Sequence, residues 1–234
     1  TAQPTYGDLR YDIEGLGAAT RISDKMILSS ANLRNASATQ EQSLVRGMRK
    51  KMERQIIHGT DAAEGGDANG FDGLNDIGSI VKDLGDPTAL SDGDIEDNTR
   101  ELIDAVEYAG APRGDIGIVC GFDWHRRLRE SLIDDVRYDA GDEDAGAFTS
   151  LVFDDVPVYK SHAFTRLSDL GASTTAAPIY AVNMNATYLG MLRETSVEPL
   201  ARLGPQERIS VDAYGALVAE APDHIKSFTV TTSA

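Results

Sequence analysis

The residues able to do chemistry are few and far apart in this sequence. The chain has four histidines: His58, His125, His162 and His224. None of them has another histidine or a cysteine at the short spacing typical of metal ligands. The single cysteine, Cys120, rules out an intrachain disulfide and a cysteine-based metal cage. Because Cys120 lies in an apolar run, we expect a small buried hydrophobe there.

Motifs that bind nucleotides or activate a nucleophile are also missing. Residues 15–20 begin like a dinucleotide-binding loop, but Thr20 stands where a third small residue belongs, and residues 21–29 follow a strand pattern. The chain contains no Walker loop, no Gly-x-Ser-x-Gly elbow and no His-Glu-x-x-His pair. The Gly/Asp-rich stretch 59–75 lacks the alternating acids of a calcium loop. We therefore expect no catalytic residue, no metal and no cofactor, and a protein that is not an enzyme.

The most distinctive chemistry is a cluster of positive charge in a very acidic chain. The formal net charge is -16, which argues against a protein that coats nucleic acid nonspecifically. Five basic residues nevertheless stand close together: Arg46, Arg49, Lys50, Lys51 and Arg54. They form the candidate site, a basic helix face directed at an anionic neighbour. The simpler alternative is a solvated face that complements the helix dipole.

A helix predicted over about residues 38–58 positions this cluster. Its apolar residues recur at helical spacing: Leu44, Val45, Met48, Met52 and Ile56. Ser37 with Gln40, or Thr39 with Gln42, supplies a starting cap. Gly59 follows the last helical residue, where glycine commonly ends a helix.

The remaining elements indicate an α+β protein. Residues 9–13 and 21–29 are predicted to form a two-stranded ribbon around a turn at 14–17. A second helix begins at Ser91, with Asp94 as its capping partner, and ends before Gly110. A third follows from Trp124 to about Ile133, after a cap at Asp123. The predicted strands are 115–120, 151–153, 156–159, 178–182, parts of 186–203, 208–218 and 225–231. Helices and strands do not alternate regularly, which favours α+β over a parallel α/β sheet.

The order of these elements resembles the major capsid proteins of tailed double-stranded-DNA viruses, which have the Hong Kong ninety-seven fold. The resemblance covers nearly the whole chain and rests on a series of short motifs. These are Glu53, Gly59 and Gly73-Leu74 around the first helix, the strand and helix 116–132, Val156-Pro157-Val158, Ile179-Tyr180, Tyr214–Val218 and Pro222. The chain has Asp154-Asp155 where many relatives have a glycine before the Pro-containing turn.

The resemblance implies a division of the chain into five parts. They are an N-terminal arm at 1–8, an extended hairpin loop at 9–36, the spine helix with the peripheral domain at 37–112, an axial domain at 113–192, and closing strands of the peripheral domain at 193–234. Mature relatives often lack a cleaved N-terminal segment, and a chain that starts at Thr1 would suit this.

The resemblance also implies a function. Copies would assemble as pentamers and hexamers into an icosahedral shell around double-stranded DNA, with the basic helix facing the interior. Cement, portal and tail proteins are the further partners, no membrane is involved, and the protein would reside in the virion after assembly in the host cytoplasm. The acidic, lysine-poor composition points to a virus of halophilic archaea.

Two other interpretations of the function remain open. The first is an encapsulin, in which the same fold encloses cargo enzymes instead of DNA. The second is an unrelated soluble α+β enzyme whose active site gathers residues distant in sequence. The capsid and encapsulin hypotheses predict very large assemblies, whereas the enzyme hypothesis predicts a compact small oligomer.

Overall fold

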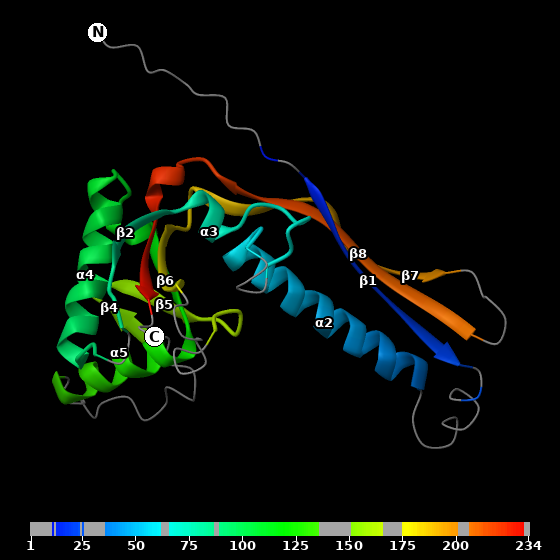
Figure 1. Cartoon of the computed structure of the whole chain (residues 1–234). Coiled ribbons are helices and arrows are strands. Elements are labelled where there is room, and N and C mark those ends of the chain that lie inside the picture. The colour runs from blue at the N-terminus through cyan, green and yellow to red at the C-terminus, as the bar shows by residue number, and fades with distance from the viewer. Residues whose placement is uncertain are drawn as a thin grey trace, which may run out of the picture.

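The computed structural model describes residues 11, 13–23, 25, 36–61, 66–86, 89–135, 151–165, 175–200 and 206–231. These residues form a body built around a six-stranded sheet and an arm built from a three-stranded sheet and a long helix (Figure 1). Each part has its own hydrophobic cluster. The fold therefore has two centres of packing, and the basic helix belongs to the arm.

The sheet of the body mixes parallel and antiparallel pairs. In spatial order its strands are β2 (Ser79–Asp83), β9 (Ile225–Thr231), β6 (Thr175–Asn183), β3 (Ile116–Cys120), β5 (Val156–Lys160) and β4 (Leu151–Phe153). The β2–β9 and β3–β5 pairs are parallel, and the other neighbours are antiparallel. Side chains of β6 alternate between the two hydrophobic clusters: Ile179 joins one and Tyr180 the other. This strand therefore lies between the two cores.

Two helices cover one face of this sheet. Helix α4 (Asp92–Tyr108) begins at Ser91, whose side chain accepts a hydrogen bond from the Asp94 amide while the Asp94 carboxylate reaches back. Helix α5 (Phe122–Asp135) packs beside it, and the Trp124 indole donates to the Thr99 hydroxyl at 3.3 Å. Buried side chains of both helices and of β3, β5 and β6 form one core. Short 3-10 helices lie at Arg113–Asp115 and Pro222–His224.

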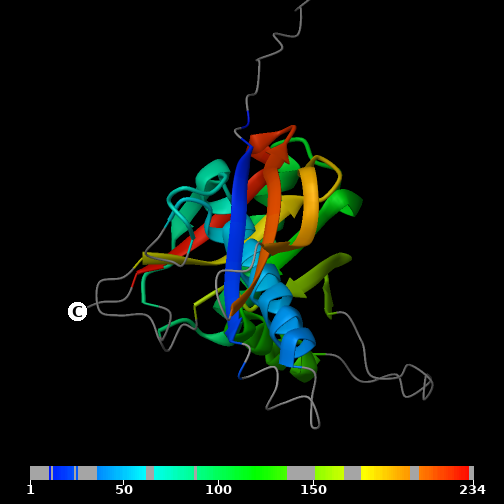
Figure 2. The same ribbon diagram turned by 90° about the vertical axis from the view of Figure 1, so that its right-hand side faces the viewer.

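The arm is a ribbon of three strands with a helix along one face. Strand β8 (Gln206–Ala219) lies between β1 (Glu14–Ser23) and β7 (Thr187–Leu200), and all pairs are antiparallel. Helix α2 (Ala36–His58) runs beside this sheet, and short helix α3 (Leu74–Ile77) lies near its C-terminal end (Figures 1 and 2). The second core fills the space between α2, the sheet of the arm and β6.

The predicted turn at residues 14–17 is wrong. Residues 14–23 form one continuous strand whose partner is β8, from the pair of Glu14 and Gly215 to the pair of Ser23 and Gln206. Small and apolar residues alternate throughout this stretch, which is compatible with a strand. The prediction of a turn rested on its glycines, but glycine also occurs within strands where another chain segment approaches closely. Gly15 is needed because a Cβ there would lie 2.7 Å from the Tyr214 ring. The rest of the expected ribbon, at 9–10 and 26–29, lies outside the described residues.

Several other elements differ from the sequence predictions. Helix α5 begins at Phe122, so Asp123 lies within it and is not its cap. The expected caps of the first helix, at 37–42, lie inside α2. Residues 187–200 form a single long strand, and the short elements β2 and α3 were not predicted. The α+β class itself is confirmed.

The predicted boundary between residues 112 and 113 cuts across a packed unit. Helix α4 lies on the N-terminal side of this boundary, yet it packs on α5, β6 and β9 of the body. Strand β2 also pairs with β9 in the body sheet. We therefore propose that residues 79–108 belong with the unit that the sequence assigned to residues 113–192.

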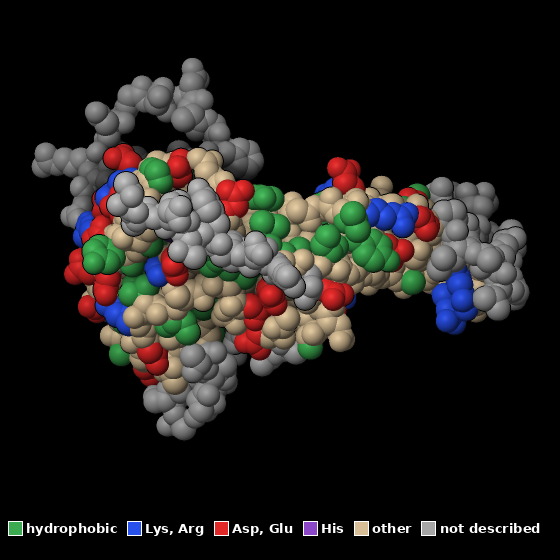
Figure 3. All heavy atoms as spheres, turned by 90° about the horizontal axis from the view of Figure 1, so that it is seen from above, with side chains coloured by type: hydrophobic (Ala, Val, Ile, Leu, Met, Phe, Trp, Pro, Cys, Tyr) green, Lys and Arg blue, Asp and Glu red, His purple; other side chains and the backbone are tan. Residues whose placement is uncertain are grey.

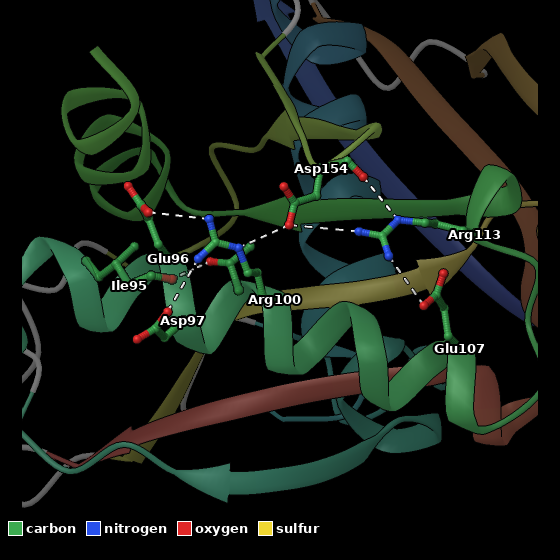
Figure 4. Close-up of polar contacts among 8 residues, drawn as sticks. Ile95, Glu96, Asp97, Arg100, Glu107, Arg113 and Asp154 are labelled. Carbon is green, nitrogen blue, oxygen red and sulfur yellow. Dashed lines mark hydrogen bonds and ion pairs between the residues drawn. The ribbon is translucent and has the colours of Figure 1, made fainter. Parts of the chain in front are cut away.

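The turn between β4 and β5 uses two aspartates where a glycine was expected. Asp154 and Asp155 both have positive φ, 48° and 65°, in the left-handed region. The Asp154 carboxylate accepts from the Arg100 guanidinium at 3.1 Å, and Arg113 donates to the Asp154 backbone carbonyl at 3.1 Å (Figure 4). Further ion pairs join these arginines to acids of α4: Glu96, Asp97 and Glu107. Each exposed pair contributes little, about 0.2–1 kcal/mol, but together they fasten the turn to α4.

Candidate functional site: the basic face of helix α2

One side of helix α2 packs against the core, and the other side carries charged residues. Met48 is fully buried, and Leu44, Val45, Met52 and Ile56 pack against the same core, as the apolar spacing predicts. The helix ends at His58, because Gly59 adopts φ +57° and its amide hydrogen-bonds the Gln55 carbonyl at 2.9 Å. A side chain at Gly59 would collide with the Asp76 carboxylate. The predicted apolar stripe of this helix and its end before Gly59 are thus confirmed.

The five basic residues lie on the arc of α2 away from its buried stripe. Arg46, Arg49, Lys50 and Arg54 are exposed, and Lys51 is half-buried. The Lys51 ammonium pairs with the Asp67 carboxylate at 2.9 Å, and this contact holds the pKa of Asp67 below its usual value. Among the described residues, the other four cations have no ion-pair partner, so their charges are available to an external anion.

Buried Gln55 determines where Asp67 lies. Its amide nitrogen donates to the carbonyls of Gly59 at 2.7 Å and Phe71 at 2.6 Å, and its oxygen accepts from the Asp67 amide at 2.9 Å. Gln55 is 1% exposed, so these bonds are shielded from water. A polar residue inside an apolar helical stripe was the sequence signal for this role, and it was overlooked. Because Gln55 fixes Asp67, it also sets which of the five cations is neutralised.

The C-terminal half of α2 is fastened to the body by two side chains. The Glu53 carboxylate accepts hydrogen bonds from the Ser161 hydroxyl and, at 3.2 Å, from the His162 amide. The His58 ring lies 2.9 Å from the Ala163 carbonyl and edge-on to the Phe164 ring. Burial lowers the pKa of His58 below its usual value, so its ring is neutral near pH 7 and donates to that carbonyl. These contacts fix the basic helix relative to the six-stranded sheet.

The opposite face of the arm has a different character. Viewed from above, hydrophobic side chains gather along the arm (Figure 3). Tyr188 is 49% exposed, Leu192 73% and Tyr214 41%, and all three lie on β7 or β8. Isolated apolar side chains are common at protein surfaces, but several along one sheet are typical of an interaction surface.

The described residues contain no arrangement that suggests catalysis. Within those ranges, no three His, Cys, Asp or Glu side chains come close enough to hold a metal ion. Cys120 is buried, and burial raises the pKa of its thiol to about 12. His224 is held by Asn183 and the Ala109 carbonyl, at 3.1 Å each, in a purely structural contact. In the same part of the chain, no helix has the length and hydropathy to cross a membrane.

Comparison with known proteins gives structural relatives but no sequence relatives. No family model matches the chain, and no curated protein matches it. Among solved structures, a protein of Gordonia phage Cozz superposes with a TM-score of 0.68 at 12% identity, covering 98% of this chain and 78% of that one. The capsid structure of cyanophage P-SCSP1u gives 0.65 at 13% identity, covering 99% and 78%. This chain has the tailed-phage capsid fold.

The same fold also appears in a different kind of assembly. The holo-SrpI encapsulin complex of Synechococcus elongatus superposes with a TM-score of 0.63 at 13% identity, covering 94% of this chain and 74% of that one. Identities this low establish the fold and leave the contents of any shell open.

Proposed function

We propose that this protein is the major subunit of a capsid shell of a tailed virus, with its basic helix directed at packaged double-stranded DNA. The observation that carries the proposal is the superposition on phage capsid structures over nearly the whole chain. In this role the protein is structural and not an enzyme. Its partners are copies of itself, in pentamers and hexamers, together with cement, portal and tail proteins.

The shape of the arm supports assembly. The three-stranded sheet of the arm is covered by α2 on one face, while Tyr188, Leu192 and Tyr214 leave apolar area in solvent on the other side. A neighbouring subunit that covers these side chains would gain about 25 cal/mol for each Å² of apolar surface removed from water. The arm is thus better explained as part of an assembly than as part of an isolated molecule.

The charge of α2 supports an inward orientation. Arg46, Arg49, Lys50 and Arg54 have no ion-pair partner among the described residues, although acids greatly outnumber bases in the chain. Phosphate groups are the anions that such a cluster of exposed cations fits best, because contacts to phosphate need charge and no base sequence. The acidic composition elsewhere supports a further proposal, a host that lives in high salt.

Particle composition tests this function. Purified protein should elute as capsomers or shells in size-exclusion chromatography with light scattering, and particles from the native source should contain nuclease-protected DNA. Particles that contain a packaged enzyme and no DNA would instead support the encapsulin alternative, which the SrpI superposition favours. A compact small oligomer at every salt concentration would contradict both shell proposals.

Charge-neutral variants test the orientation of the helix. The variant Arg46→Gln/Arg49→Gln/Lys50→Gln/Arg54→Gln should still assemble but bind duplex DNA with a weaker salt dependence. Each lost phosphate contact lowers the slope of log K against log salt by about 0.9. The control is Arg21→Gln/Arg193→Gln, because both residues are exposed on strands of the arm sheet and Arg193 already pairs with Glu198. Equal slopes for the two variants would contradict an inward-facing basic helix.

A further inference from the structure

A second basic cluster lies outside α2, where α5 begins and β5 ends. We call it the α5–β5 patch and define it by five side chains: Phe122, His125, Arg129, Lys160 and His162. The Phe122 ring is its centre. The His162 ring lies 4.5 Å from it, and the Lys160 ammonium lies over it at 5.8 Å. Cations within about 6 Å of an aromatic face are attracted to it, so the Phe122 ring helps to hold Lys160 in place.

The charges of the α5–β5 patch are directed outward. The two cations, Arg129 and Lys160, are exposed, and neither has an ion pair with another described residue. His162 is exposed beside them. Lys160 and Arg129 are close enough to His125 to help lower its pKa, although burial is the larger cause. The neighbouring Arg126 differs, because it pairs with Glu130 at 4.0 Å. A chain of net charge -16 thus keeps positive groups together at this point without neutralising them.

The patch meets the C-terminal half of α2 at one junction. Glu53 follows Arg49 and Lys50 by one helical turn on the same side of α2, and its carboxylate binds Ser161 and the His162 amide. His162 in turn contacts Phe122, and Lys160, the last residue of β5, precedes His162 by two residues. The Glu53 carboxylate is occupied by the hydrogen bonds of this junction. Two stretches more than one hundred residues apart in sequence therefore meet at Glu53, with basic residues on both sides of the junction.

We infer that the α5–β5 patch is a second contact site for the phosphate backbone of duplex DNA, which extends the footprint from α2 onto the body. This inference rests on the proposed function, because it assumes that the face bearing α2 meets DNA. The chemistry is the same in both parts: exposed cations that have no ion-pair partner among the described residues. DNA that lies along this face would contact α2 and α5 together.

Salt-dependent DNA binding separates the two contributions. The full-length protein, in its assembled capsomers, is titrated with a fluorescent duplex of random sequence, and anisotropy is followed from low to moderate NaCl. The variants are Arg129→Gln/Lys160→Gln for the patch, the quadruple glutamine variant for α2, and Arg21→Gln/Arg193→Gln as control. Loss of two phosphate contacts should reduce the slope of log K against log salt by about 1.8. Light scattering and thermal unfolding check that each variant assembles and folds like the parent.

The outcomes distinguish the two proposals. A reduced slope in the patch variant, relative to the control, supports the second contact site. A patch variant that matches the control, while the α2 variant loses slope, overturns this inference and leaves the proposed function intact. If the patch variant alone loses slope, α2 does not contact DNA, and the inference that the patch extends a footprint from α2 is overturned with it. If neither changes, both proposals fail.

Discussion

The substitution Gln55→Met tests how the end of α2 is built. Methionine keeps the volume and flexibility of glutamine but cannot donate or accept the amide hydrogen bonds. In the native protein Gln55 is 1% exposed and bonds to Gly59, Asp67 and Phe71. The variant would bury these backbone groups with fewer partners, while the apolar packing around them changes little.

The expected loss follows from the bonds removed. Three contacts lie between 2.6 and 2.9 Å, and each buried hydrogen bond contributes about 1 kcal/mol net, so the free energy of unfolding should fall by about 3 kcal/mol. For a chain of this size, about 2–4 °C of Tm is lost per kcal/mol, which predicts a decrease of about 6–12 °C. Asp67 would also lose its anchor, and Lys51 would then join the unpaired cations of α2.

Differential scanning calorimetry measures the shift, with every sample at one protomer concentration because the Tm of an oligomer depends on it. Gln42→Met is the matched control, since Gln42 is exposed on the same helix. It should change stability by less than about 0.5 kcal/mol. Hydrogen exchange should additionally rise at residues 66–73 in Gln55→Met. A Tm for Gln55→Met within 2 °C of the control, with no change in exchange, would refute this account of the loop.

Three further predictions concern single groups. Burial lowers the pKa of His58, so the unfolded chain binds a proton at this ring more readily than the folded chain does. The free energy of unfolding is therefore at its full value above about pH 6.5 and declines as the pH falls below that. In urea titrations, His58→Gln should make this decline with pH shallower. Part of the decline should remain, because the pKa of His125 is lowered as well. An unchanged dependence of stability on pH would contradict the role given to His58. Cys120, with a thiol pKa near 12, should resist alkylation by iodoacetamide at pH 8 and react once the protein is unfolded; rapid labelling of native protein would show that the site is open. Asp155→Gly should raise stability by about 1 kcal/mol because φ +65° costs an L-residue strain that glycine avoids, whereas Asp155→Val should lower it; a lower Tm for the glycine variant would mean that the turn holds no such strain.

The sequence predicted the elements whose signals are local. The stripe from Leu44 to Ile56, followed by Gly59, gave α2 nearly to the residue, because helical spacing and a left-handed glycine act within one segment. Ser91 with Asp94 gave the start of α4 for the same reason. Strands β3, β5 and β9 were also recognisable from short apolar runs. These features need no knowledge of the partner against which they pack.

Such local signals could not predict which distant segments pair with each other. The sequence around Gly15 reads equally well as a turn or a strand, and only its pairing with the chain at Tyr214 makes it β1. Strand β2 is short, and its place is decided by β9, almost 150 residues later. Strand propensity depends on the neighbours a residue meets, so it cannot be judged in one segment alone.

The basic cluster on α2 was visible in the sequence because its five residues lie close together in the chain. Their exposure could be predicted from the helical spacing of the apolar residues. The ion pair between Lys51 and Asp67 could not, because it depends on the hydrogen bond that Gln55 makes to the Asp67 backbone. The α5–β5 patch was not visible, since Lys160 and Phe122 meet only through the parallel pairing of β3 with β5. Sequence alone thus determined the three long helices of the described residues, α2, α4 and α5, and where charge accumulates along the chain. Tertiary structure decided which charges share a surface, because electrostatic neighbours are set by distance in space.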